Sequence, residues 1–172
     1  AVELLTTDSQ VRALRIADYL KQQNSQRQSA ERKIFQQVCE VITQTGLDHP
    51  DRRTIVLGSE QWHTGIIGIV AARVVDRFYK PTILINTENG LGKGSARSVE
   101  GFDIYSAINA CSEYVVKFGG HSMAAGITLE PAKIGEFADA FEKYAVENFR
   151  ETASAAKIEI DAICPIRDIS YN

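Results

Sequence analysis

The sequence predicts an α/β fold in which a central sheet is flanked by helices and preceded by a long connector helix. Short apolar segments alternate with amphipathic helical patterns between residues 54 and 149, as in a sheet covered by helices. Residues 6–45 carry helical periodicity alone. A length of 172 residues, 44% of them hydrophobic and 24% charged, suits one globular domain with appendages.

The N-terminal segment, residues 6–45, is predicted to form one long helix or two in succession. Apolar residues recur at spacings of three and four on both sides of a polar centre: Val11, Leu14, Ala17, then Ala30, Ile34, Val38 and Val41. The centre itself, residues 21–29, is entirely polar and cannot pack on an apolar face, which predicts a solvated connector across a gap. Gly46 and Pro50 end this helix.

The remaining elements follow from short patterns taken in order. They are a strand at 54–58, a loop at 59–64, an apolar helix at 65–79, a strand at 82–86, a turn at 88–90, an extended segment at 91–99, a helix at 102–116, a strand at 123–129 and a helix at 131–149. Gly119 or Gly120 is expected to cap the helix at 102–116 in the left-handed conformation. Residues 157–163 alternate polar and apolar, which predicts the first strand of another module.

Composition and charge exclude several classes of protein. No run approaches the roughly 20 apolar residues of a membrane span, and the first residues resemble neither a start nor a signal peptide, so we expect a piece of a longer protein. The net charge of −3 argues against generic duplex binding but leaves room for a local basic groove. The cysteines at 39, 111 and 164 lack zinc spacing, which predicts reduced, buried thiols in a cytoplasmic protein.

Two glycine-rich segments, 94–98 and 119–126, combine groups that bind phosphate oxygens. Glycine lets the backbone approach a ligand, and arginine offers a planar fork that matches a phosphate edge. Ser95 and Arg97, two positions apart on an extended segment, project from the same side and can reach one ligand. The alternative is a glycine-rich β-bulge with Arg97 in a surface salt bridge.

His121 follows Gly119 and Gly120, and small residues follow it in turn. Such a histidine can donate a hydrogen bond or accept a proton at a phosphate, but it can equally be structural. Lys93 does not belong to a Walker loop, because a glycine separates it from Ser95 and the segment is extended.

Residues 62–65 precede the apolar helix, whose N-terminal amides can receive an anion, with Thr64 as a candidate cap; a cap alone also explains them. Arg27, on the connector, is either solvated or a ligand contact. The sequence shows neither a cluster of Asp and His for catalytic metals nor a nucleophile elbow. From the residues alone, we expect a phosphate-binding module without a catalytic group set of its own.

Residues 58–71, 92–98 and 118–126 resemble the RecJ single-stranded-DNA exonucleases of the DHH phosphoesterase superfamily. The glycine–histidine motif is shared with alanyl-tRNA synthetases, inorganic pyrophosphatases and nano-RNases, whereas the context of Trp62 and His63 is more specific to RecJ. The resemblance implies an interlobe connector at 1–48, a DHH-associated substrate-binding domain with a central mixed sheet at 49–150, and the start of an oligonucleotide-binding module at 151–172.

For the parent protein, the resemblance implies 5′→3′ degradation of single-stranded DNA to mononucleotides in recombination and repair, with Mn²⁺ or Mg²⁺. The metal ligands would lie in the DHH catalytic lobe, the partner in cis, and none in this chain, which we expect to be inactive alone. The alternatives are a non-catalytic module that binds nucleic acid or a partner, or an oligoribonuclease-type or tRNA-editing relative.

The same resemblance implies roles for particular residues. Ser95, Arg97, Gly119 and Gly120 would hold the phosphate of the terminal nucleotide. His121 would face the scissile phosphate and stabilise its developing charge. Further candidates for substrate contact are Lys93, Trp62, His63 and, on the connector, Arg27.

Overall fold

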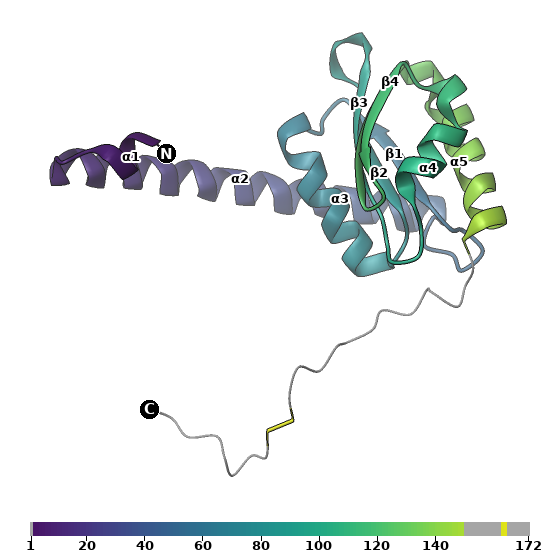
Figure 1. The fold of residues 1–172 in the computed structure, drawn as a ribbon, viewed down its shortest axis with the longest axis horizontal. Coiled ribbons are helices and arrows are strands. Elements are labelled where there is room, and N and C mark those ends of the chain that lie inside the picture. The colour runs from purple at the N-terminus through teal and green to yellow at the C-terminus, as the bar shows by residue number, and fades with distance from the viewer. Residues whose placement is uncertain (1, 150–162, 165–172) are drawn as a thin grey trace.

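The computed structural model describes residues 2–149 and 163–164, and its core is a mixed five-stranded sheet (Figure 1). The strands are β1 (Ile55–Ser59), β2 (Thr82–Asn86), β3 (Gly92–Arg97), β4 (Lys117–His121) and β5 (Ala124–Leu129), in the order β1-β2-β3-β5-β4. β1 and β2 are parallel and the other neighbours are antiparallel. The α-helices are α1 (Val2–Thr6), α2 (Gln10–Thr45), α3 (Thr64–Phe78), α4 (Ile104–Ala110) and α5 (Ile134–Asn148), with 3₁₀ turns at Glu88–Gly90, Ser112–Tyr114 and Pro131–Lys133. The predicted architecture, including the long N-terminal helix, is confirmed.

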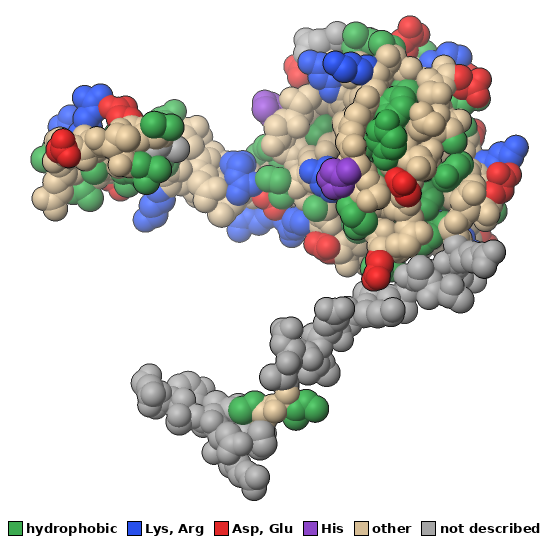
Figure 2. Space-filling model, in the orientation of Figure 1, with side chains coloured by type: hydrophobic (Ala, Val, Ile, Leu, Met, Phe, Trp, Pro, Cys, Tyr) green, Lys and Arg blue, Asp and Glu red, His purple; other side chains and the backbone are tan. Residues whose placement is uncertain are grey.

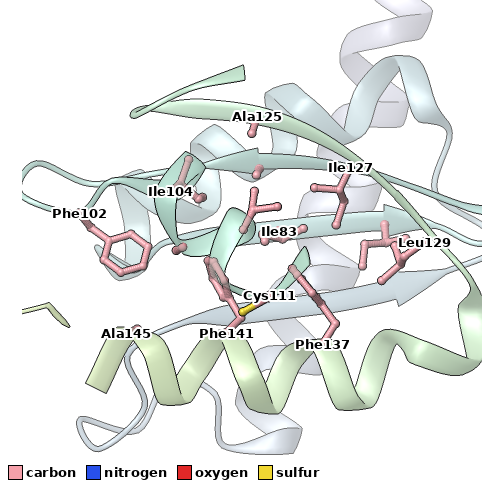
Figure 3. Close-up of a cluster of buried hydrophobic side chains, with 14 of the residues drawn as sticks. Ile83, Phe102, Ile104, Cys111, Ala125, Ile127, Leu129, Phe137, Phe141 and Ala145 are labelled. Carbon is pink, nitrogen blue, oxygen red and sulfur yellow. The ribbon is translucent and has the colours of Figure 1, made fainter. Parts of the chain in front are cut away.

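Helices cover the two faces of the sheet unequally. α4 and α5 lie on one face, where Phe137 and Phe141 of α5 and Ile104 of α4 pack against the strands (Figure 3). α3 and the end of α2 lie on the other face, around a second core that contains Leu84 and Ile55. β2 is buried along its whole length, with Ile83 and Ile85 in the first core and Leu84 in the second. On the α3 side, the buried apolar residues of the sheet lie on β1 and β2; α3 also contacts β3, and in the described part of the chain no helix covers β5 and β4 there.

The connector is a continuous helix of which only the last part joins the domain. α2 begins at the cap Ser9 and ends at Gly46, which has the left-handed conformation (φ 69°). Its buried residues all fall in the C-terminal third: Ile34, Val38, Cys39 and Ile42. The preceding turns project from the domain as a rod (Figure 1), and hydrophobic, basic and acidic side chains are mixed along it (Figure 2). The predicted helix is confirmed, and its polar segment 21–29 is mostly exposed, with a break in the helix at residues 7–9; that the helix connects two lobes stays a prediction.

The predicted helix at 102–116 is wrong in its second half. α4 ends at Ala110, and after a 3₁₀ turn the chain enters β4, so Gly119 and Gly120 are strand residues and not a helix cap. The reason is a run of strand-forming residues at 115, 116 and 118, whose apolar spacing also fits a helix. The Val116 N–H donates to the carbonyl of Thr128 at 2.8 Å, which begins the pairing with β5.

Other expectations are met in part. Cys39 and Cys111 are buried, and burial raises the pKa of the Cys111 thiol to about 11, whereas Cys164 is exposed. Nearly all of the predicted strand at 157–163 lies outside the described residues. Within the part of the chain that the structure describes, no helix is both long enough and apolar enough to cross a membrane.

Candidate phosphate-binding site

On the α3 side, α3 packs against β1, β2 and the Ser95–Arg97 end of β3, and β5 and β4 lie beyond it without a covering helix among the described residues. Ser95 is paired with Leu84, a core residue beneath α3, and Ser95 is in turn paired with Gly126, which is paired with Gly119. Paired residues of neighbouring strands share a face. Alternate residues of the three strands therefore form one surface, here called the open face: Lys93, Ser95, Arg97, Lys117, Gly119, His121, Ala124, Gly126 and Thr128. All nine are exposed or half-buried.

Strand register arranges the open face in three rows. Arg97, Ala124 and His121 form the first row; Ser95, Gly126 and Gly119 form the middle row. Lys93, Thr128 and Lys117 form the third row. Successive rows are about 7 Å apart, and β3 and β4 are about 10 Å apart across β5. Basic groups thus stand at both ends of the open face, with hydroxyl and glycine positions between them.

Ser95 and Arg97 lie together, as the sequence predicts. The Arg97 guanidinium donates through Nη1 to Ser95 Oγ at 3.0 Å and to the Ala96 carbonyl at 2.8 Å. β3 keeps a continuous register from Gly92 to Arg97, so it contains no bulge. Among the described residues, no carboxylate pairs with Arg97. The alternative of a bulge with a salt-bridged arginine is therefore not what the structure contains.

Gly68 of α3 lies directly over this pair, and the sequence did not single it out. A Cβ added at Gly68 would lie 3.0 Å from Arg97 Nη2 and 3.0 Å from Ser95 Oγ. The absence of a side chain is what allows α3 to pack here without displacing the guanidinium. A glycine inside an otherwise apolar helix was the available signal, because it costs helix stability and needs a packing reason.

His121 is exposed at the end of β4 and is held by the turn that follows it. Its Nδ1 accepts from the Met123 N–H at 3.3 Å, so the proton of the neutral ring belongs on Nε2, which is then a donor. The turn is tied down from two sides, because the Ser98 N–H donates to Met123 (2.9 Å) and the Ile104 N–H donates to Ser122 (3.0 Å). The histidine therefore occupies a defined position at the rim of the open face.

The glycines of β4 serve different purposes. Gly120 has φ 155°, and an added Cβ would lie 2.3 Å from the Ala124 carbonyl oxygen, so only glycine fits the tight approach of β4 to β5. Gly119 has nothing within 4 Å of an added Cβ, and Gly126, its partner across the ladder, meets a single carbonyl oxygen at 4.0 Å. Glycine weakens a strand, so two adjacent glycines without a packing reason mark a surface that another molecule approaches closely.

The residues before α3 take structural positions. His63 is the N-cap, its Nδ1 accepting from the Gly65 N–H at 3.1 Å, so the expectation of Thr64 as the cap is wrong. The Nδ1 atom of histidine can cap a helix because, like the Oδ atoms of aspartate, it is an acceptor bonded to Cγ. Trp62 is buried in the core, and its carbonyl accepts from Asn86 Nδ2 at 2.7 Å. Neither side chain belongs to the open face.

Arg27 lies on α2, also away from the open face. It donates to Asn24 and, at 3.1 Å, to Glu31, whose other oxygen accepts from Arg73 of α3 at 3.0 Å. Figure 2 shows Lys and Arg side chains gathered where the projecting part of α2 meets the domain. This network links α2 to α3 beside the buried residues that anchor the end of α2.

The open face offers hydrogen-bond donors but no metal ligand set. Across residues 2–149 and 163–164, no three His, Cys, Asp or Glu side chains are placed to hold one ion. The site residues of this chain therefore do not fit a catalytic divalent metal, and the arrangement is suited to holding an anion.

Comparisons with known proteins show the family of this fold. A family model described as the DHHA1 domain matches residues 51–147. The single-stranded-DNA-specific exonuclease RecJ of Bacillus subtilis is 35% identical over 172 residues, which are 99% of this chain and 22% of that protein. RecJ of Thermus thermophilus is 29% identical over 145 residues, covering 84% of this chain and 20% of that protein.

Solved structures give the same result. The crystal structure of RecJ in complex with Mg²⁺ from Thermus thermophilus matches with a TM-score of 0.73 and 28% identity, over 84% of this chain and 22% of that one. A crystal structure of exonuclease RecJ bound to manganese matches with a TM-score of 0.71 and 28% identity, over 84% and 35%. The chain spans well under half of each relative. It belongs to the DHHA1 domain family and is similar, over nearly its whole length, to a part of RecJ.

Proposed function

We propose that this chain is the substrate-binding lobe of a metal-dependent 5′→3′ exonuclease that degrades single-stranded DNA to mononucleotides in recombination and repair. The observation that carries the proposal is the open face, where Ser95, Arg97 and His121 surround two unencumbered glycines. The names of the relatives, single-stranded-DNA-specific exonucleases, supply the class of substrate.

In this proposal the guanidinium of Arg97 and the hydroxyl of Ser95 hold the phosphate of the terminal nucleotide. A guanidinium binds two phosphate oxygens at once, and Ser95 already fixes its orientation. Gly119 and its cross-strand partner Gly126 let the sugar–phosphate backbone approach the sheet closely, while Gly120 keeps β4 tight against β5 at this point. The Nε2 proton of His121 stabilises the charge that develops on the scissile phosphate.

Hydrolysis needs groups that this lobe lacks. Structures of the relatives contain Mg²⁺ or Mn²⁺, and such an ion would supply the attacking hydroxide and neutralise phosphate charge. We place its ligands in a DHH catalytic lobe of the same polypeptide, joined through α2. The chain alone is then inactive, binds no metal at its phosphate site, and works in the cytoplasm, where DNA and reduced cysteines occur together.

The test is an amide NMR titration of the chain with a short 5′-phosphorylated single-stranded oligonucleotide. We expect shifts confined to residues 93–98, 119–121 and 124–128. The same oligonucleotide without its 5′-phosphate should give smaller shifts at Ser95 and Arg97. Absence of shifts on the open face at millimolar ligand would contradict the proposal, as would mononucleotide release by the purified chain with Mn²⁺.

A further inference from the structure

Lys117 is the first residue of β4, and the pairing of the strands places it on the open face. It is paired with Thr128, which is paired on its other side with Lys93 of β3. The two lysines therefore belong to one row, about 10 Å apart across β5. Both are exposed.

In the part of the chain that the structure describes, no acidic side chain pairs with this row. The side chains of Lys93 and Lys117 form no hydrogen bond or ion pair among the residues that the structure describes. Strands β3, β4 and β5 contain no Asp or Glu, although the whole chain carries a net charge of −3. Although the chain is acidic overall, the charged side chains on these three strands are basic, apart from the neutral or protonated His121. The local positive potential on the open face favours binding of an anion.

The lysine row borders a groove that leads toward Ser95 and Arg97, where the terminal phosphate is proposed to bind. Lys93, Lys117, Gly119, Gly126 and Thr128 line a depression of about 370 Å³. The lysine row lies four strand residues from the row of Arg97 and His121, a distance of about 13 Å. Between them lies the middle row, whose two glycines leave the path clear. A single phosphate cannot contact both ends, whereas an extended single strand covers the distance in a few nucleotides.

We propose that Lys93 and Lys117, on either side of Thr128, form a second phosphate subsite that binds a backbone phosphate of the same single strand, further along from its terminal phosphate. The inference rests on the proposed function, because it takes the Arg97 end as the position of the terminal phosphate. The single-stranded DNA then runs parallel to β3 and β4, over the glycines of the middle row. With this subsite, the affinity of the open face depends on the length of the oligonucleotide, and polynucleotides bind more tightly than mononucleotides.

The experiment measures the affinity of 5′-phosphorylated oligothymidylates, from the mononucleotide to the hexanucleotide, and its salt dependence. The variants are Lys93→Gln, Lys117→Gln and their combination, with Lys143→Gln on α5 as the matched control on the opposite face. We expect affinity to rise stepwise once the ligand reaches the lysine row. Each substitution should remove about two- to fivefold of the hexanucleotide affinity. It should also lower the salt slope by about 0.7. Affinity for the mononucleotide should be unchanged.

The outcomes separate this inference from the proposed function. If wild-type chain binds the hexanucleotide in an Arg97-dependent way, but the lysine variants behave like Lys143→Gln, the second subsite is wrong and the proposed function stands. If no oligonucleotide binds the open face, the proposed function itself fails. If a poly-glutamate peptide of equal charge shifts the same amides with equal affinity, the row is a general anion site, and its assignment to DNA is overturned.

Discussion

Arg97 and His121 lie on opposite sides of Ala124, with which both are paired in the sheet. A guanidinium and an imidazole therefore stand about 10 Å apart at their backbones, with only a methyl group between them. In the proposed complex, the two side chains approach the terminal phosphate region from opposite sides. Ser95 orients the first of these groups, and the turn at Met123 orients the second.

Arg97→Ala should weaken binding of 5′-phosphorylated oligonucleotide by about 1.5–3 kcal/mol, because a charge-assisted hydrogen-bonding group is lost. The side chain is half-buried and has no carboxylate partner among the described residues, so the melting temperature should change little. Calorimetric titration and thermal unfolding measure the two effects. Arg97→Lys should recover only part of the affinity, since an ammonium lacks the planar fork.

The control for this substitution is Arg15→Ala on the projecting part of α2, which should bind like wild type. A clearly lowered melting temperature in Arg97→Ala, together with wild-type affinity at temperatures where the variant is folded, would show that the arginine is structural.

Gly119→Ala and Gly120→Ala should have opposite effects. Gly119 has open space around an added Cβ, so the alanine variant should be as stable as wild type or more stable by about 0.4–1 kcal/mol, while binding weakens. Gly120→Ala forces a Cβ against the backbone of β5 and should lose about 1–3 kcal/mol of stability or more. Urea unfolding and oligonucleotide titration on both variants decide the matter. Equal loss of stability in the two would refute the argument that Gly119 is kept free for a ligand.

Gly68→Ala should reduce binding without unfolding the domain. Alanine gains up to about 1 kcal/mol of helix propensity, but its Cβ presses on the Arg97 guanidinium and the Ser95 hydroxyl at 3.0 Å. We expect stability within about 1 kcal/mol of wild type and a clear loss of affinity. Gly135→Ala in α5, where an added Cβ meets nothing within 4 Å, is the matched control and should bind normally. Wild-type affinity in Gly68→Ala would mean that the pair adjusts freely.

Asp103, the N-cap of α4, predicts a pH dependence of stability. Hydrogen bonds from the Ser106 backbone and hydroxyl, and then from the Tyr105 N–H, hold the pKa of this carboxyl below its usual value. A lowered folded-state pKa contributes stability above the ordinary aspartate pKa of about 4, and that contribution is lost as pH falls through the folded value.

The corresponding variant is Asp103→Asn, which keeps a cap acceptor but does not titrate. In thermal unfolding, wild type should exceed it in stability at pH 7, and the difference should shrink as pH falls below about 4. A difference that stays constant across this range would rule out the carboxylate as its source.

The sequence predicts strands β1, β2, β3 and β5 but not β4, and it predicts that Ser95 and Arg97 project from the same side, because these features depend on local pattern. Strand β2, predicted at 82–86, is correct to the residue, and α5 is shortened only by a 3₁₀ turn at Pro131. α4 was overextended because the apolar residues at 111 and 115 fit a helix, while pairing of Val116 with Thr128 favoured a strand. Local pattern could not decide between them.

The missed parts of the site all depend on which segments become neighbours. Gly68 matters only because α3 crosses β3 above Ser95, and Lys117 matters only because Thr128 places it in the row of Lys93. Each of these contacts joins residues that are far apart in the sequence, so local pattern cannot predict it. Trp62 and His63 were grouped with the site from sequence, and the structure places them in the core and at a helix cap.

The long helix α2 acts mechanically as a lever. Its C-terminal third is fixed in the domain core and through Glu31 to α3, while about 20 residues extend beyond, an arm of about 30 Å. A tilt of a few degrees at the embedded end therefore becomes a displacement of a few ångströms at Gln10, comparable to the length of a hydrogen bond. Small repacking around Ile34 and Val38 is thus amplified at the far end of the helix.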